Sequence, residues 1–333
     1  MNFARPEAES QPQNAGRMPR GATTSPPRHM LRMADLDAFH LGTLIDLAAK
    51  MKHAPNDWDV TLRGRSVACY FTKPSTRTRV SFEAACWRLG ALPVMLRPDE
   101  LQLGRGEPLA DTARVLSSYC AAIGVRTFKQ ADVEELAAHA SVPLLNLLTD
   151  DHHPCQALAD LLTLQEHFRQ LDGLRLAYVG DGNNVAHSLL EAGALSGMHV
   201  TVACPPNHLP RADIVEHAGL LARQSGGSVA VVTSPAEAVK DAHAVYTDVW
   251  VSMGDADGDA RHADLAAYRV TPELMAMADP DAVFLHCLPA HRGEEVSADV
   301  IDGPASLVWQ QAANRLPTEQ ALLYALTTGA WEE

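Results

Sequence analysis

The stretch FTKPSTRTR, residues 71–79, places several hydroxyl and cationic side chains at the end of the apolar run CYF. Ser75 or Thr76 can cap the helix that the following TRVSFEAACWRLG predicts. A helix N-terminus presents free N–H groups and the positive end of the helix dipole, which suits a phosphate group. Thr78 adds a further hydroxyl and Arg77 a planar, charged fork. A capped surface helix with exposed arginines is the plainer interpretation, but the complete string favours a site for a small anion.

Two further groups of polar residues follow strand-like runs. Arg126 comes directly after AAIGV, and the string DHHPCQALADLL, residues 151–162, comes shortly after VPLLNLL. A single histidine is usually structural, but His152, His153 and Gln156 together could polarise a carbonyl or hold a polar ligand. No matching pair of zinc ligands accompanies them. We therefore predict a polar ligand rather than a metal at this strand end.

The second half of the chain repeats the pattern with amide and acidic side chains. The Gly-rich turn YVGDGNN, residues 178–184, ends a strand-like run, but GDGNNV does not match G-x-G-x-x-G, so a dinucleotide site is only weakly supported. Its asparagines, Asn184 included, could instead bind the carboxylate of an amino acid. In TDVWVSMGD, residues 247–255, Asp248 could bind an ammonium group, and Ser252 lies close behind it. Much of the acidic string that follows, over residues 255–264, is expected to be a solvated surface loop.

Cys287 lies at the end of another apolar run, in FLHCLPAHRGEE. A cysteine in an apolar strand is ordinarily a packing residue. Beside His286 it could be reactive if its pKa is depressed, and its distance from Asp248 would decide the matter. Arg315, in AANRLP, is one more candidate ligand for an anion.

The composition excludes several classes of function. The 333 residues contain 27 Lys plus Arg against 41 Asp plus Glu, a net charge of −14, so no nucleic-acid partner is expected. The six scattered cysteines form no C-x-x-C pair, which predicts a reducing, cytoplasmic setting. No apolar stretch reaches the roughly 18–20 residues of a membrane span, so no membrane partner is expected. The basic cluster at residues 71–79 must therefore bind a small anionic molecule, or no ligand at all.

Strand-like and helix-like segments alternate from residue 30 onward, which predicts parallel sheets covered by helices. The expected strands are Val67–Phe71, Pro93–Leu96, Ala121–Arg126, Val142–Leu147, Leu174–Val179, His199–Ala203, Ser228–Thr233, Ala244–Val249 and Ala282–Leu288. They predict two doubly wound α/β domains, each a parallel sheet flanked by helices, that join near residues 148–155. Pro317 should break or kink the final helical stretch. Residues 1–29 have few large apolar side chains and are predicted to be a disordered extension.

The strings PSTRTR, HPCQALADL, GDGNN, DVWVSMG, HCLPAHRG and NRL occur in this order between about Met30 and Leu326. In this they resemble the aspartate/ornithine carbamoyltransferase family. The resemblance implies a carbamoyl-phosphate-binding domain over 30–152, completed by a returning C-terminal helix at about 316–330, and an ornithine-binding domain over 153–315. It also implies a homotrimer, which could associate further, with active sites between subunits.

The resemblance implies a role for individual residues as well. The ligands of carbamoyl phosphate would be Ser75, Thr76, Arg77, Thr78, Gln102, Arg126, His153, Gln156, Cys287, Leu288 and Arg315, with Gln102 reaching in from a neighbouring subunit. The ligands of ornithine would be Asn184, Asp248, Ser252 and Met253. Catalysis would rest on Cys287, Asp248, Arg126 and His153.

In the implied reaction, the δ-amine of L-ornithine attacks carbamoyl phosphate to give L-citrulline and phosphate, and no metal or organic cofactor is needed. Asp248 and Cys287 are expected to take part in deprotonating the amine. Arg126, His153 and the Thr78 hydroxyl would stabilise charge on the carbamoyl oxygen. Two alternatives stay open, namely a related acceptor such as putrescine or an N-acylated ornithine, and a binding protein without turnover. Aspartate is disfavoured because HCLP would then be expected to read H-P-L-P.

Overall fold

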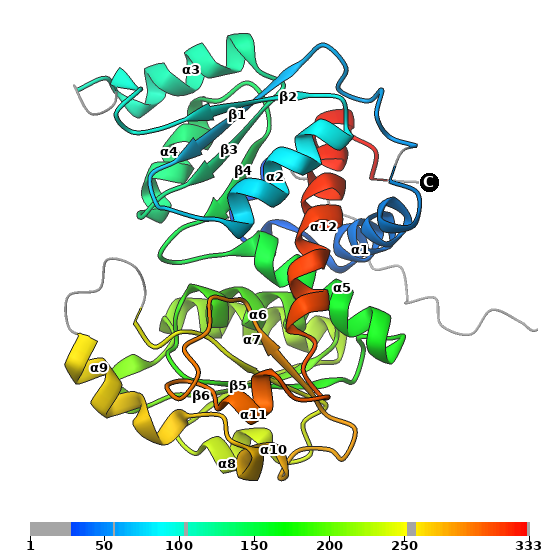
Figure 1. Ribbon diagram of the computed structural model, residues 1–333. Coiled ribbons are helices and arrows are strands. Elements are labelled where there is room, and N and C mark those ends of the chain that lie inside the picture. The colour runs from blue at the N-terminus through cyan, green and yellow to red at the C-terminus, as the bar shows by residue number, and fades with distance from the viewer. Residues whose placement is uncertain (1–27, 56, 103–105, 252–257, 332–333) are drawn as a thin grey trace, which may run out of the picture.

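The computed structural model describes residues 28–55, 57–102, 106–251 and 258–331. Figure 1 shows two halves, each with a sheet and covering helices, joined by long helices that run between them. The predicted extension over 1–29 lies outside the described residues except for its last two. Arg28 donates to the carbonyl of Ala140, and the Nδ1 of His29 accepts from the amide of Leu144, so both residues lie against the first sheet.

The first sheet is parallel, with strand order β2-β1-β3-β4. Its strands are β1 (Ser66–Phe71), β2 (Leu92–Leu96), β3 (Ala122–Arg126) and β4 (Leu144–Leu148), and its helices are α2 (Arg77–Arg88), α3 (Leu109–Tyr119) and α4 (Gln130–His139). Gly124 explains how closely α2 approaches β3, because a Cβ there would lie 2.6 Å from the Phe82 ring. Strand β3 is buried along its whole length, as expected of a sheet covered on both faces.

The second sheet is also parallel, with strand order β7-β6-β5-β8-β9. Its strands are β5 (Arg175–Val179), β6 (His199–Ala203), β7 (Ser228–Val232), β8 (Ala244–Thr247) and β9 (Val283–His286). The helical segments around it are α6 (Asn184–Leu195), η3 (Pro206–His208), α7 (Ala212–Ser225), α8 (Pro235–Val239), α9 (Gly258–Leu265), η4 (Ala266–Tyr268), α10 (Pro272–Met275) and α11 (Ala298–Ile301). None of the helices in the described ranges combines the length and apolar character that a bilayer crossing requires.

Each sheet has a point at which the strand order reverses. In the first sheet it lies between β1 and β3, and in the second between β5 and β8. Connections leave such neighbouring strands toward opposite faces, which opens a crevice at their carboxyl ends where α/β proteins bind ligands. Four of the strings that the sequence analysis singled out follow these four strands, so the fold itself places them at two ligand-binding positions.

Helices from both ends and from the middle of the chain connect the halves. They are η1 (Met33–Asp35), α1 (Ala38–His53), α5 (Pro154–Phe168) and α12 (Val308–Thr328). Helix α12 starts beside β9 and then packs against α1, α5 and α2, so the C-terminal segment returns to the first sheet as expected.

Helix α12 continues through Pro317, so the break expected there is absent, whereas the alternative, a kink at this residue, stays a prediction. Proline removes one backbone donor from a helix interior. The Thr318 hydroxyl donates to the carbonyls of Asn314 (2.8 Å) and Arg315 (3.1 Å), next to the missing bond. Pro317 itself is buried, and packing on three other helices holds the segment helical. The nine predicted strands and the two-sheet α/β fold are confirmed, whereas the exact domain boundaries stay a prediction.

Candidate active site

The N-terminus of α2 forms a turn at the end of β1. The Ser75 hydroxyl accepts from the amide of Thr78 at 3.2 Å, so Ser75 supplies the capping oxygen. Thr76 occupies the N-cap position, but within the described chain its hydroxyl makes no capping bond. Thr78 is buried in the first turn and Arg77 is half-buried. This arrangement leaves the first amides of the helix and two hydroxyl groups at one strand end.

Three guanidinium groups converge on this turn. Arg126, from the end of β3, and Arg315, from α12, donate to the Thr78 hydroxyl at 3.3 and 3.1 Å. Burial, together with the charges of Arg315 and Arg77, lowers the pKa of Arg126 to about 10. Among the described residues, the Nε atoms of Arg126 and Arg315 are buried without a hydrogen-bond partner. A buried group of like charges is costly unless an anion joins it, so this pocket is built for one.

A network behind the pocket fixes Arg315. Its guanidinium pairs with the buried Glu319 at 2.6 Å and donates to the Gln156 side chain at 2.8 Å. Gln156 donates in turn to Asp160 at 2.8 Å, and burial raises the pKa of Asp160 to about 7. The sequence reasoning named Gln156 and Arg315 but missed these two acids. Both acids lie four residues after their partners in a helix, a spacing that could have revealed them.

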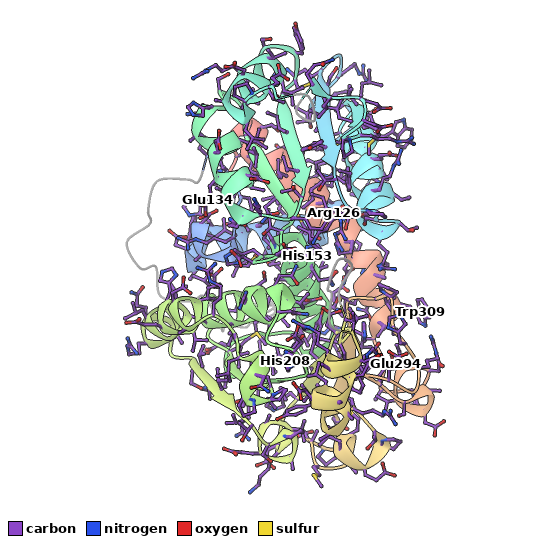
Figure 2. The ribbon with its side chains drawn as sticks, turned by 90° about the vertical axis from the view of Figure 1, so that its left-hand side faces the viewer. Arg126, Glu134, His153, His208, Glu294 and Trp309 are labelled. Carbon is purple, nitrogen blue, oxygen red and sulfur yellow. The ribbon has the colours of Figure 1, made fainter. Side chains whose placement is uncertain are left out.

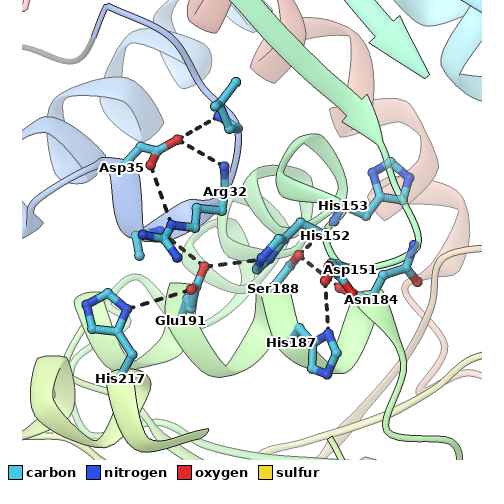
Figure 3. A network of polar contacts seen from close by, with 12 residues as sticks. Arg32, Asp35, Asp151, His152, His153, Asn184, His187, Ser188, Glu191 and His217 are labelled. Atoms are coloured by element: carbon cyan, nitrogen blue, oxygen red, sulfur yellow. Dashed lines mark hydrogen bonds and ion pairs between the residues drawn. The ribbon is translucent and has the colours of Figure 1, made fainter. Parts of the chain in front are cut away.

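His153 reaches the same pocket from the start of α5. Figure 2 shows Arg126 and His153 close together where the two halves of the molecule meet. Burial and the neighbouring arginines hold the pKa of His153 well below its usual value, so the ring is neutral. Its amide donates to the Ser188 hydroxyl at 2.8 Å (Figure 3), and its Nδ1 has no partner among the described residues. His152 lies apart, with its Nδ1 at 3.9 Å from a Glu191 carboxylate oxygen.

The second sheet supplies an acidic position at its own crevice. Asp248, buried at the end of β8, accepts from the Asn183 side chain at 2.8 Å. Asn183 also caps α6, since its Oδ1 accepts from the amides of Val185 and Ala186. The predicted ligand Asn184 instead donates to the carbonyl of Thr149 at 2.6 Å. The asparagine that contacts Asp248 is therefore the neighbour of the one that the sequence reasoning chose.

Cys287 lies beside Asp248, as the sequence reasoning required, but not as an activated thiolate. Its Sγ donates to Asp248 Oδ1 at 2.8 Å, and burial together with the Asp248 charge raises the pKa of the thiol well above its usual value. The hypothesis of a depressed pKa is wrong, because the nearest charge is negative. His286 cannot activate the thiol either, since its Nδ1 accepts from the Leu288 amide at 2.8 Å and its Nε2 faces Glu295.

One hydrogen bond joins the two crevices. Arg77 of the first domain donates to the carbonyl of Leu288, which follows β9, at 2.5 Å. Leu288 has a positive φ of 58°, so the backbone turns sharply just after Cys287. This hydrogen bond therefore brings the cationic pocket close to the Cys287–Asp248 pair. A phosphorylated molecule and an amine would meet there.

Comparison with known proteins agrees with this geometry. Residues 28–166 match the family model described as aspartate/ornithine carbamoyltransferase, carbamoyl-P binding domain, and residues 172–326 match the Asp/Orn binding domain. The chain belongs to the aspartate/ornithine carbamoyltransferase family. The first family model covers the pocket residues as far as Gln156, including Arg77 and Arg126. The second covers Asp248 and Cys287, and also Arg315, the third arginine of the pocket.

Individual relatives of the family cover nearly the same length. A curated ornithine carbamoyltransferase of Acidothermus cellulolyticus is 51% identical over 304 residues, 91% of this chain and 97% of its own. One from Hyperthermus butylicus is 50% identical over 301 residues, covering 89% of this chain and 96% of its own. The solved ornithine carbamoyltransferase of Pyrococcus furiosus superposes with a TM-score of 0.87 at 46% identity, covering 91% of this chain and 98% of that one.

The assignment of three predicted ligands stays a prediction. Ser252 and Met253 lie outside the described residues. Gln102 is exposed, close to the gap at 103–105, and its assignment to a neighbouring subunit's site stays a prediction. Thr72, at the edge of the phosphate motif, donates through its hydroxyl to the carbonyl of Arg126 at 3.2 Å, so it braces β1 against β3.

Proposed function

We propose that this protein transfers the carbamoyl group of carbamoyl phosphate to the δ-amine of L-ornithine, giving L-citrulline and phosphate. The observation that carries the proposal is the Arg77–Leu288 hydrogen bond, because it sets the three-arginine pocket directly against the Asp248–Cys287 pair. One position suits the phosphate and carbamoyl oxygens, and the other suits a cationic amine.

In this proposal the arginine pocket holds carbamoyl phosphate. The phosphate group lies at the N-terminus of α2, where Arg77 and the first amides of the helix offset the charge that grows as phosphate leaves. The carbamoyl oxygen faces Arg126 and the neutral ring of His153, which donate without having to reorganise. Arg315 and Gln156 fix the pocket from behind.

The amine enters from the second domain. Asp248 attracts the ammonium group of ornithine. The neutral Cys287 thiol orients the Asp248 carboxylate by donating a hydrogen bond to it. As the amine approaches the carbamoyl carbon it must lose a proton, and Asp248 is the acceptor at hand. Ser252 and Met253 complete the ornithine site in this proposal.

We further propose a homotrimer, in which Gln102 reaches a neighbouring active site, and a cytoplasmic role in arginine metabolism. The cytoplasm is a reducing compartment in which disulfides are rare. The cysteines support this location, since all six lie within the described residues and all are free.

The test is a competition assay with the purified protein. Carbamoyl phosphate is supplied with equal concentrations of L-ornithine, putrescine, N-acetylornithine and L-aspartate, and the carbamoylated products are identified by mass spectrometry. Citrulline should be the main product. A different ureido compound as the main product would move the assignment to that acceptor, and no product with any amine would favour a binding protein.

A further inference from the structure

A second group of titratable side chains lies in the second domain, outside the proposed active site. His262 comes from α9, and His291, Glu294 and Glu295 come from the turn after β9. The ligand atoms of the last three lie within 4.8 Å of one another. Figure 2 labels Glu294 in the lower half of the molecule, away from Arg126 and His153. The proposed reaction uses none of these four residues directly.

Three of their separations can be compared with those in the coordination shell of a small divalent ion. His262 Nε2 lies 2.9 Å from Glu294 Oε2, and His291 Nδ1 lies 3.9 Å from that oxygen and 3.7 Å from Glu295 Oε2. Ligands at about 2.0–2.1 Å from a tetrahedral zinc ion lie roughly 3.3–3.4 Å from one another. These three separations lie on either side of that value. His262 lies outside the group whose ligand atoms are all within 4.8 Å of one another, so its ring has to move toward His291 and Glu295 to join the shell.

Glu295 supplies an independent indication of a ligand. The residue is fully buried, and its Oε1 accepts from the His286 ring at 3.2 Å and from the His291 amide at 2.6 Å. Its Oε2 is buried and has no hydrogen-bond partner among the described residues. A buried carboxylate oxygen without a partner is costly. This oxygen is the one that faces His291 in the cluster, where a cation would satisfy it.

His262 is oriented in the way metal-binding histidines are. Its Nδ1 lies 2.6 Å from the carbonyl of Gly258 and donates to it, and its ring packs edge-on against Trp250 at 5.9 Å. An imidazole held by a backbone carbonyl presents its other nitrogen as a ligand in a fixed direction. That nitrogen points at the Glu294 carboxylate, an arrangement that needs either a proton or a metal ion between the two groups.

We propose that His262, His291, Glu294 and Glu295 bind one zinc-type divalent ion. Two imidazoles and two carboxylates suit zinc, cobalt or nickel better than calcium or magnesium, which take oxygen ligands. The ion would clamp α9 to the turn after β9. Through Glu295 it would also steady His286, the residue before Cys287. Its role is structural, and the carbamoyl transfer does not pass through it.

The experiment measures zinc binding by calorimetry on the full chain after treatment with a chelator. We expect one ion per chain, with affinity lowered at least about tenfold to a hundredfold in Glu294→Gln and in His291→Asn. Both side chains are about half exposed, so these variants should fold normally, which their unfolding temperatures without metal will show. Glu237→Gln, an exposed acid on α8, is the matched control and should bind zinc like the parent.

Cobalt distinguishes this site from the Asp248, His286 and Cys287 group, whose ligand atoms are similarly close. Cobalt at the proposed site gives no thiolate charge-transfer band, and its spectrum persists in Cys287→Ser. The proposal is overturned if zinc does not bind, if both ligand variants bind zinc like the parent, or if the cobalt spectrum depends on Cys287.

Discussion

Arg77 makes a contact between the domains that sets it apart from the next arginine of its motif. Its guanidinium joins the pocket at α2 to the Leu288 carbonyl of the other domain, and it is half-buried. Arg79, two residues on, points elsewhere and pairs with Glu83 at 3.2 Å, with both side chains more than a third exposed. The two arginines therefore form a natural pair for a test of the phosphate site.

Arg77→Ala should lower kcat/KM for carbamoyl phosphate by about 10²–10³, the usual loss when one charge-stabilising donor is removed. Steady-state kinetics with varied carbamoyl phosphate at saturating ornithine measures this loss in kcat/KM. Arg79→Ala removes only a surface ion pair worth about 0–1 kcal/mol and should stay within about twofold of the parent. Equal losses in the two variants would contradict the role given to Arg77.

Sequence reasoning predicted the positions of those residues whose placement depends on local geometry. Ser75, Arg77 and Thr78 lie within one turn at a strand end, so their shared position followed from their spacing. Whether Asn183 or Asn184 contacts Asp248 depends on the residue at which α6 begins. The conformation of the turn before the helix determines that residue. The pKa of Cys287 depended on burial and on Asp248, 39 positions away, which no local pattern contains.

Helix α12 is the element that unites the site. Within nine residues it contributes Gln311, which accepts from the His286 amide, and Arg315 and Glu319 in the pocket. The expectation of a break at Pro317 came from local propensity alone, and tertiary packing overrode it. The Arg315–Glu319 pair is fully buried, so each charge depends on the other.

Glu319→Gln should destabilise the free protein by about 3–5 kcal/mol, because it leaves the Arg315 charge without its buried partner. An anion in the pocket can take over part of that role. Inorganic phosphate should therefore raise the unfolding temperature of the variant more than that of the parent, as thermal scans with and without phosphate will show. Glu83→Gln, a partly exposed acid on α2, is the control. Equal phosphate shifts in variant and parent would contradict this coupling.

At the scale of the whole molecule, a buried acid connects the two domains. Glu191 on α6 accepts from the amide of Ala34, whose segment pairs with the first sheet through Met30 and Leu145. Figure 3 shows the charged and titratable groups around it, which are Arg32, Asp35, His152 and His217, with His187 on the same helix. Burial raises the pKa of Glu191 to about 7.

A raised carboxyl pKa means that the folded state binds the proton more tightly than the unfolded state. Stability is therefore lost as pH rises from about 4.5 to about 7, by roughly 1–3 kcal/mol for this group. Glu191→Gln removes this dependence of stability on pH. As the pH rises from 5 to 8, the unfolding temperature of the variant should therefore gain roughly 2–6 °C relative to that of the parent. The exposed Glu216→Gln on α7 should show no such gain. Parallel pH profiles for Glu191→Gln and the parent would refute the assignment.

The overall architecture was largely predictable from sequence. Each expected strand overlaps an observed one, with ends that differ by at most two residues. Continuous apolar runs and alternating helices are sufficient for that, because parallel sheets bury both faces. The sequence pattern did not predict the contact between the domains, since Glu191 and Ala34 meet only after both halves have folded.

The return of α12 to the first sheet bears on the order in which the protein is made. A ribosome releases Arg315 only after the entire second domain has emerged, so a growing chain carries Thr78 and Arg126 without their third partner. The α2 side chains Phe82 and Cys86, fully buried in the core that includes α12, then lack part of their cover. The amino-terminal domain is thus first to be synthesised but among the last parts to be finished, and only full-length chains can present a complete anion pocket.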